Sequence, residues 1–255
     1  MIRTLFATVC LAIITVLAGP PLLLYVALTG SVMPLYRAGV AAALWASRVA
    51  GMRIRAVSLE NIPAGPCLFA ANHTSNADPP AIVGATPRRI AVLAKKSLFS
   101  IPIVGTAFRM SAYVPVDRGN PERAAASVDV AVEHMRQGVS YLVYPEGTRS
   151  RSGRLLPFRK GAFALAIKAG VPVVPVACIG AHRVLPKNAF RIRPGEIAVK
   201  FCPAIDAREY SLDQRGELAE RVHAAIAAAL PPDQQPDQPD QQSGAKAKLV
   251  PNESA

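Results

Sequence analysis

A long apolar segment without charge opens the chain. No charged residue occurs between Arg3 and Arg37. Because about 20 apolar residues span a bilayer, this segment is long for one crossing and short for two crossings with a turn. The run Gly19-Pro20-Pro21 divides it into two pieces, each shorter than a full span. We therefore expect either one kinked or tilted transmembrane helix or a helical hairpin that dips into one leaflet.

A second apolar segment, residues 38–46, follows after a short gap. It contains Trp45 and is succeeded by Arg48, Arg53 and Arg55. Apolar side chains with an aromatic residue and neighbouring arginines are typical of a helix that lies in the membrane interface. We expect such an interfacial helix next to the first apolar segment.

A cleaved signal peptide is the alternative interpretation of the amino terminus, with cleavage after Ala18. Apolar sequence continues well beyond that site, and cleavage would remove Cys10 and leave an odd number of cysteines. Both points disfavour this alternative. The cysteines lie in or beside apolar runs, where free thiols pack as small hydrophobic groups, so we expect no disulfide and no metal site. They are Cys10, Cys67, Cys178 and Cys202.

Beyond residue 60, short β-rich runs alternate with helical patterns. This alternation predicts an α/β domain. Each candidate strand is a short apolar run rich in branched side chains and bounded by turn residues. The candidate strands are residues 67–71, 90–94, 113–116, 140–144, 173–179 and 196–201.

Three helices are predicted from apolar stripes and from their end signals. The first begins at Asn120 and ends before Gly138, and the second spans residues 158–169. The third follows a capping box formed by Ser211 and Gln214. Its apolar stripe consists of Leu218, Val222, Ile226 and Leu230.

The chain is therefore predicted to have three parts. Residues 1–56 form membrane-associated helices, and residues 57–230 form the α/β domain. Residues 231–255 repeat Asp, Gln and Pro, which cannot bury a hydrophobic core, so we expect this tail to be disordered.

Composition and charge indicate which kinds of molecule this protein binds. Hydrophobic residues make up 51% of the 255 residues, mean hydropathy is +0.25, and the net charge is +12. The tail has more acidic than basic residues, so the positive charge belongs to residues 1–230. Such a basic body fits an anionic membrane surface, an acidic carrier or a phosphorylated substrate. Nucleic acid is disfavoured because only 6% of residues are aromatic and no zinc spacing or nucleic-acid motif occurs.

His73 and Asp78 are the strongest candidates for chemistry. They lie five positions apart in the run NHTSNADPP, directly after a predicted strand. A histidine oriented by a carboxylate is a common device for deprotonating an alcohol at neutral pH. Asp78 followed by Pro79 is also typical of a helix start, with Asp as the cap. Both roles can hold at once.

Further polar blocks follow other predicted strands. They are AKKSL at 94–98, VDR at 116–118 and YPEGTRS at 144–150, followed by the apolar run VPVVPV at 171–176. Taken singly, the charged residues in these blocks could be ordinary surface cations or ion pairs within a loop. A later basic loop contains His182, Arg183 and Lys187 and has no assigned role.

In this order, the blocks resemble those of the glycerolipid acyltransferase superfamily, and most closely of its lysophosphatidic acid (1-acylglycerol-3-phosphate) acyltransferases. The resemblance covers roughly the central half of the chain and implies a mixed central sheet flanked by helices. It also implies that residues 57–230 are the acyltransferase domain and that a membrane-embedded helical element lies at the amino terminus.

The resemblance implies roles for individual residues. His73 is the general base and Asp78 orients its imidazole. Arg118 and Arg149 bind the acceptor phosphate, for which planar guanidinium groups are well suited. Glu146 helps to hold the glycerol hydroxyls. Gly147 and Thr148 belong to the same substrate-binding block, and either Lys95 or Lys96 assists at the phosphate.

The implied reaction is direct acyl transfer from a thioester. The lysophosphatidic acid hydroxyl attacks acyl-CoA or an acyl carrier protein thioester and gives phosphatidic acid for phospholipid synthesis. No G-x-S-x-G motif supplies a nucleophile, and no cofactor beyond the thioester co-substrate is expected. Backbone N–H groups at the helix start after Asp78 are candidate donors to the oxyanion.

Other functions remain open at this point. Another lysolipid acceptor, such as a lysophospholipid or a lyso-aminolipid, would use the same chemistry. A non-catalytic membrane lipid-binding module is an alternative of a different class, and a secreted esterase is disfavoured by the missing nucleophile motif. We expect contact with membrane lipids and a catalytic domain on the cytoplasmic side of the membrane.

Overall fold

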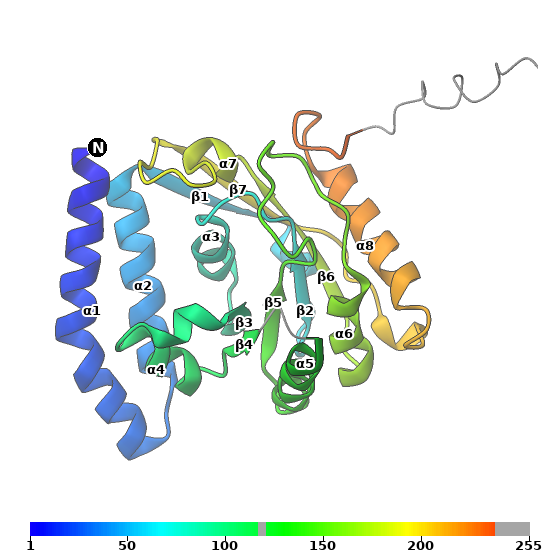
Figure 1. Ribbon diagram of the computed structural model, residues 1–255, viewed down its shortest axis with the longest axis horizontal. Helices are drawn as coiled ribbons and strands as arrows, with labels where there is room; N and C mark the ends of the chain where they lie inside the picture. Colours follow the sequence, from blue (N-terminus) through cyan, green and yellow to red (C-terminus); the bar gives the residue numbers. More distant parts are fainter. Residues whose placement is uncertain (117–120, 238–255) are drawn as a thin grey trace, which may run out of the picture.

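A mixed seven-stranded sheet forms the centre of the molecule (Figure 1). This computed structural model describes residues 1–116 and 121–237, with the backbone alone for 121–125. The strand order is β1-β7-β6-β2-β5-β3-β4, and neighbouring strands are parallel except for the antiparallel pair β6 and β7. The predicted α/β class with a mixed central sheet is confirmed.

The six predicted strands are present within one or two residues of their expected ends. The structure adds a seventh strand, β1, at one edge of the sheet. The strands are β1 Met52–Val57, β2 Leu68–Ala71, β3 Ile90–Lys95, β4 Val114–Val116, β5 Ser140–Val143, β6 Val173–Ile179 and β7 Gly195–Phe201.

Strand β1 corrects the prediction for residues 52–57. Its side chains alternate, with Met52 buried and with Arg53 and Arg55 exposed. This period of two is the pattern of a strand at a sheet edge. Because β1 pairs with β7, the sheet begins before the predicted domain boundary at residue 57.

Helices α1 Ile2–Thr29 and α2 Met33–Ala50 form an antiparallel hairpin on one side of the sheet (Figure 1). Of the two alternatives for the first apolar segment, the structure has a single helix, because α1 continues through Pro20 and Pro21 and is not divided into two pieces. Both prolines are exposed. Helix α2 is also longer than the predicted segment 38–46.

Helix α1 is long and apolar enough to cross a membrane, and only 11% of its most apolar part is buried. At 1.5 Å per residue, its 28 residues extend about 42 Å. A signal-peptide cut after Ala18 would fall in the middle of this helix, next to Gly19, which is buried against Ile103.

The remaining helices cover the two faces of the sheet. Helix α3 and helix α4 lie between the hairpin and the sheet, whereas α5, α6 and α8 cover the opposite face (Figure 1). The elements not yet described are η1 Leu59–Asn61, α3 Asp78–Ala85, η2 Lys96–Ser100, α4 Val104–Met110, α5 Pro121–Arg136, η3 Lys160–Phe163, α6 Ala164–Ala169, α7 Ala181–Val184, η4 Ala207–Glu209 and α8 Arg215–Ala229.

Two of the three predicted helices match closely. Helix α5 buries Ala131 and Met135, although its expected cap Asn120 lies outside the described residues. Helix α8 buries its predicted stripe, and Ser211 N donates to Gln214 Oε1 at 3.0 Å. The helix predicted over residues 158–169 is shorter than expected. Its first turn is a 3₁₀ helix, because the preceding segment is held by Arg159 N, which donates to Pro145 O.

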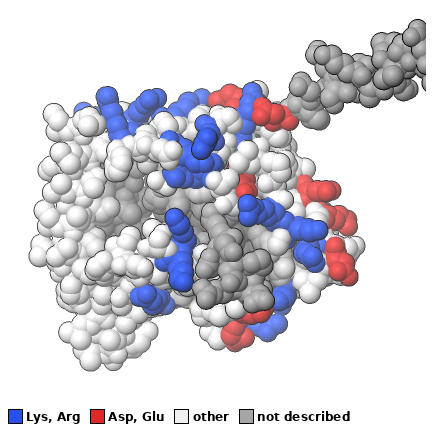
Figure 2. Space-filling view, in the orientation of Figure 1, with Lys and Arg blue, Asp and Glu red and all other residues white. Residues whose placement is uncertain are grey.

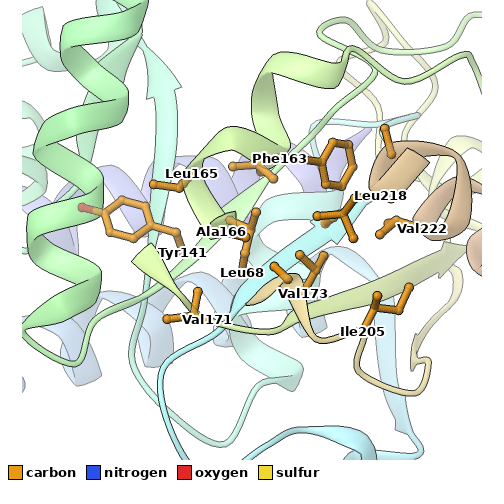
Figure 3. Packing of buried hydrophobic residues seen from close by; sticks show 14 of the residues in the cluster. Leu68, Tyr141, Phe163, Leu165, Ala166, Val171, Val173, Ile205, Leu218 and Val222 are labelled. Atoms are coloured by element: carbon orange, nitrogen blue, oxygen red, sulfur yellow. The ribbon is translucent and has the colours of Figure 1, made fainter. Parts of the chain in front are cut away.

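Each face of the sheet packs a separate hydrophobic core. In β2, Leu68 and Ala70 point to the core under α5, α6 and α8, while Phe69 and Ala71 point to the core under α3. Figure 3 shows Phe163 and Leu218 meeting in the first of these cores, beside Leu68 and Val173. Burial on both faces explains why the central strands are continuously apolar.

The prediction that the chain is disordered from residue 231 is wrong for residues 231–237. Gln234 is fully buried there, and Leu155 N donates to its carbonyl at 2.9 Å. The rest of the tail lies outside the described residues.

We predict that Phe163→Ala lowers the free energy of unfolding by about 3–5 kcal/mol, because the ring is fully buried and its loss leaves a cavity. Phe190→Ala is the matched control, since Phe190 is 94% exposed, and it should change stability by about 0.5 kcal/mol or less. Chemical unfolding in detergent measures both. Equal effects of the two substitutions would contradict the core assigned here.

Candidate active site

The loop between β2 and α3 holds a buried carboxylate. Asp78 is fully buried, and its Oδ2 lies 2.9 Å from His73 Nδ1. The same oxygen accepts hydrogen bonds from the backbone N–H groups of Thr74 at 2.7 Å and Ser75 at 2.8 Å. Because Oδ2 already acts as an acceptor, Nδ1 of His73 carries the hydrogen. The other imidazole nitrogen, Nε2, is then free to accept a proton.

The expectation that Asp78 caps helix α3 is wrong. Asp78 is the first residue of the helix, Ala77 is the N-cap, and the carboxylate accepts from the loop that precedes it. The expected oxyanion donors after Asp78 are also missing from this helix start. Pro79 and Pro80 have no N–H, and Ala81 N donates to Ala77 O.

The other oxygen of Asp78 faces strand β6. The thiol of Cys178 lies 3.4 Å from Asp78 Oδ1, and both groups are buried. The side chain of Asn72 fixes this strand by donating to Cys178 O at 3.0 Å and accepting from Cys178 N at 2.7 Å. Asn72, which follows β2, thus connects this strand to β6 next to the buried Asp78 carboxylate.

The backbone of His73 is held from the block 144–150. His73 N donates to Glu146 Oε1 at 2.8 Å, and Ser150 N donates to His73 O at 2.8 Å. The imidazole stacks on the ring of Tyr144, with centroids 4.0 Å apart and an interplanar angle of 21°. Its backbone and ring are therefore fixed before any substrate binds.

Glu146 lies under this loop and does not line the cavity described below. It is 4% exposed, and burial raises the pKa of its carboxyl to about 8. The hydrogen bond from His73 N opposes this rise in pKa, while the charge of Asp78 adds to it. A neutral Glu146 carboxyl at neutral pH follows from this environment.

Gly147 allows the turn after Glu146. Its φ is +71°, and a Cβ here would meet the Arg159 guanidinium at 2.8 Å. A larger residue would therefore be strained and would displace Arg159. The turn directs Thr148 and Arg149 away from the buried Glu146 and into the wall of the cavity.

A cavity of about 760 Å³ opens beside His73. At its polar end it is lined by His73, Lys95, Thr148 and Arg149, so four of the predicted site residues meet in one place. Its other walls are largely apolar and come from α1, α2, α3 and α4. Among them are Leu11, Leu22, Val40, Val83 and Phe108.

The structure distinguishes between the two candidate lysines. Both lysines are exposed, but only Lys95 lines the cavity. Lys187 also lines the cavity and donates to Arg149 O. No sequence motif marks Lys187 as a site residue, and only the fold brings it to the cavity. Arg118 lies outside the described residues.

We predict that Glu146→Gln removes a loss of folding stability that the wild type suffers as pH rises. Below pH 4.5 the Glu146 carboxyl is protonated in both the folded and the unfolded chain. Between pH 4.5 and about 8 the unfolded chain loses this proton and the folded chain keeps it, so the wild type loses stability as pH rises. The neutral amide escapes this loss, and its advantage should grow by on the order of 1 kcal/mol per pH unit.

Chemical unfolding of both proteins between pH 5 and pH 8 measures this difference. Glu133→Gln is the matched control, because the Glu133 side chain is 60% exposed. Its unfolding free energy should follow the wild type within about 0.5 kcal/mol at every pH. Parallel curves for wild type and Glu146→Gln would show that the Glu146 carboxyl does not retain its proton on folding.

Among the described residues, no group of three or more His, Cys, Asp or Glu side chains is placed to hold a metal ion. All four cysteines are free.

Comparison with known proteins places the chain in a family. Residues 53–179 match the family model "Acyltransferase", which includes both His73 and the block 144–150. The 1-acyl-sn-glycerol-3-phosphate acyltransferase of Limnanthes douglasii is 34% identical over 170 residues, which are 66% of this chain and 60% of that protein. The enzyme of the same name from Salmonella typhimurium is 35% identical over 163 residues, 64% of this chain and 66% of that protein.

A solved structure extends the similarity to almost the whole chain. The crystal structure of the 1-acyl-sn-glycerophosphate (LPA) acyltransferase from Thermotoga maritima superimposes with a TM-score of 0.77 at 26% identity, covering 98% of this chain and 97% of that one. The chain spans 49–60% of the length of the plant relatives that it matches. From the matched domain, the sequence identity to these relatives and the common fold, the chain belongs to the glycerolipid acyltransferase superfamily.

Proposed function

We propose that the protein transfers a fatty acyl group from an acyl thioester to the free hydroxyl of lysophosphatidic acid, giving phosphatidic acid for phospholipid synthesis. The observation that carries this proposal is the position of His73 at the junction of a cationic pocket and an apolar cavity. A lysophosphatidic acid has the same division, with a phosphate at one end and an acyl chain at the other. Relatives from plants and bacteria bear the corresponding name.

His73 acts as the general base in this proposal. Its Nε2 takes the proton from the acceptor hydroxyl, and the hydroxyl oxygen attacks the thioester carbonyl. Asp78 holds the imidazole by Nδ1 and stabilises the imidazolium that forms. When the tetrahedral intermediate collapses, the carbon–sulfur bond breaks and the imidazolium returns its proton to the departing thiolate.

The acceptor phosphate binds to the cations of the cavity wall. Arg149 and Lys187 come from different loops and are joined through the hydrogen bond from Lys187 Nζ to Arg149 O. Lys95 faces the same cavity from the end of β3. A phosphate dianion needs several such donors, and Arg118 is proposed as a further one. In the bound state we assign the glycerol hydroxyls to the part of the cavity at Thr148. Glu146 and Gly147 support this wall from behind, and Glu146 is not in contact with the cavity, contrary to the role that the resemblance implies.

The donor is proposed to be acyl-CoA or acyl carrier protein, with no other cofactor. The acyl chains lie along the apolar walls from α1 and α2, next to membrane lipids. In Figure 2 the surface over these helices is almost free of charge, while Lys and Arg gather along the top and centre of the same face. An excess of Lys and Arg is typical of the cytoplasmic side of membrane proteins. We therefore place the catalytic domain at the cytoplasmic surface.

We predict that His73→Ala lowers kcat by on the order of 10²–10⁴-fold, because no other group in the cavity replaces Nε2 as a base. Thiol release from oleoyl-CoA, or from an acyl carrier protein thioester, measures the rate. Lysophosphatidic acid, lysophosphatidylcholine and glycerol-3-phosphate are offered separately. Only the first should support His73-dependent release, since it alone has both a free phosphate and an acyl chain.

His223→Gln is the control, because His223 lies on α8 and packs on Phe158, outside the cavity lining. It should leave kcat within about twofold. Activity of His73→Ala close to that of the wild type would exclude the general-base role. His73-dependent release with lysophosphatidylcholine instead would identify a lysophospholipid as the acceptor, and no release with any pair would indicate a non-catalytic lipid-binding protein.

A further inference from the structure

A short strap follows α8 and crosses the ends of two loops of the site. It consists of residues 231–237, which we call the strap. Gln234 N and Gln235 N both donate to Pro231 O, at 2.9 and 3.1 Å, so the strap begins with a tight turn. This turn directs Gln234 inward, where it is fully buried. A buried side-chain amide is unusual in a segment of such polar composition.

Gln234 connects two loops that are otherwise far apart in the sequence. Leu155 N donates to the Gln234 carbonyl at 2.9 Å, and Gly180 N donates to Gln234 Oε1 at 2.9 Å. Leu155 ends the loop that begins at Arg149. Gly180 is the N-cap of α7, which leads into the loop that contains Lys187. One buried residue thus connects the two loops, with its main-chain carbonyl bound to the first loop and its side-chain Oε1 bound to the second.

Two exposed ion pairs flank this buried connection, one for each loop. Asp233 Oδ2 lies 3.3 Å from Arg183 Nη1 on α7, and Asp237 Oδ1 lies 3.1 Å from Arg154 Nε. Surface pairs of this kind contribute only about 0–1 kcal/mol each. They align the strap, whereas the buried hydrogen bonds of Gln234 hold it in place.

Both connected loops carry groups of the site. In the first loop, Ser150 N donates to His73 O at 2.8 Å, and Arg149 lines the cavity. In the second, Lys187 lines the cavity and donates to Arg149 O. The second loop also accepts a hydrogen bond from Ser75 Oγ at Leu185 O, at 2.7 Å. The relative position of the two cations therefore depends on how the two loops are held together.

We propose that Gln234 is a positioning residue that holds the Arg149 and Lys187 loops at the spacing needed to bind the acceptor phosphate. This inference rests on the proposed function. Cations that are already in place bind a dianion more tightly, because less conformational freedom is lost on binding. Loss of the connection should therefore weaken acceptor binding more than the chemical step, because the imidazole of His73 is oriented by Asp78, whose Oδ2 accepts its hydrogen bonds from within residues 73–78.

The test compares Gln234→Met with Gln235→Met in the full-length chain. Methionine matches the size of Gln234 but cannot accept from Gly180 N, whereas Gln235 is exposed. A neutral hydrogen bond of about 1 kcal/mol corresponds to roughly a fivefold change in binding. Gln234→Met should raise KM for lysophosphatidic acid about three- to tenfold, with kcat and KM for the acyl donor within about twofold. Gln235→Met should leave all three constants within about twofold.

Hydrogen exchange at the amides of Leu155 and Gly180 provides a readout that does not depend on activity. The Gly180 amide should exchange faster in Gln234→Met than in the wild type, because its acceptor Oε1 is lost. The Leu155 amide donates to the main-chain carbonyl of residue 234, which methionine retains, so its exchange reports whether the strap stays in place. Unchanged acceptor KM in folded Gln234→Met would overturn the proposal, whether or not exchange is faster, because the strap would then have only a structural role. Failure of the wild type to acylate lysophosphatidic acid would instead overturn the proposed function, and with it the assigned ligand.

Two truncations keep the test decisive if Gln234→Met does not fold. A chain ending at Leu230 retains all of α8 but lacks the strap, and it should show at least the same rise in acceptor KM. A chain ending at Asp237 keeps the strap contacts and should match the wild type. Equal acceptor KM for the two truncated chains would overturn the proposal.

Discussion

The buried carboxylate of Asp78 is the constraint on which the site depends. Removing an ionised carboxylate from water is costly, and this cost is offset only when hydrogen bonds satisfy its oxygens. Here the donors come from His73, Thr74 and Ser75, with the thiol of Cys178 against the second oxygen. The loop therefore has to wrap around the carboxylate, and this wrapping fixes the orientation of the imidazole.

The topology of the sheet then brings the remaining groups to the same edge. Strands β2, β3 and β5 are parallel, so the residues after their carboxyl ends lie near one another. His73 follows β2, Lys95 ends β3, and Glu146 and Arg149 follow β5. The helical hairpin adds apolar walls to this polar edge. The combination is suited to a substrate that is part phosphate and part hydrocarbon.

The sequence predicted the parts of this structure that depend on local patterns. The central strands are apolar on both faces, and the stripe of α8 repeats with helical period, so both were identified correctly. The interaction of His73 with Asp78 was also expected from their spacing. Strand β1 was missed because its alternation, Met52 to Val57, is short and follows a helix with a similar composition.

Other features depend on contacts between distant residues and could not be read from a local pattern. Pro20 and Pro21 normally interrupt a helix, yet α1 continues through them on an exposed apolar surface. The strap has the composition of a disordered tail, and only the amides of Leu155 and Gly180 explain why Gln234 is buried. Likewise, no sequence motif marks Lys187, which lines the cavity only because the folded chain brings its loop there. The most direct test of the central claim is the kcat of Asp78→Asn beside that of Asp129→Asn, an exposed control paired with Lys168. An amide in place of the Asp78 carboxylate cannot accept all of its hydrogen bonds, so the account predicts a fall in kcat on the order of 10²–10⁴-fold for Asp78→Asn alone; near-wild-type kcat in both variants would contradict it.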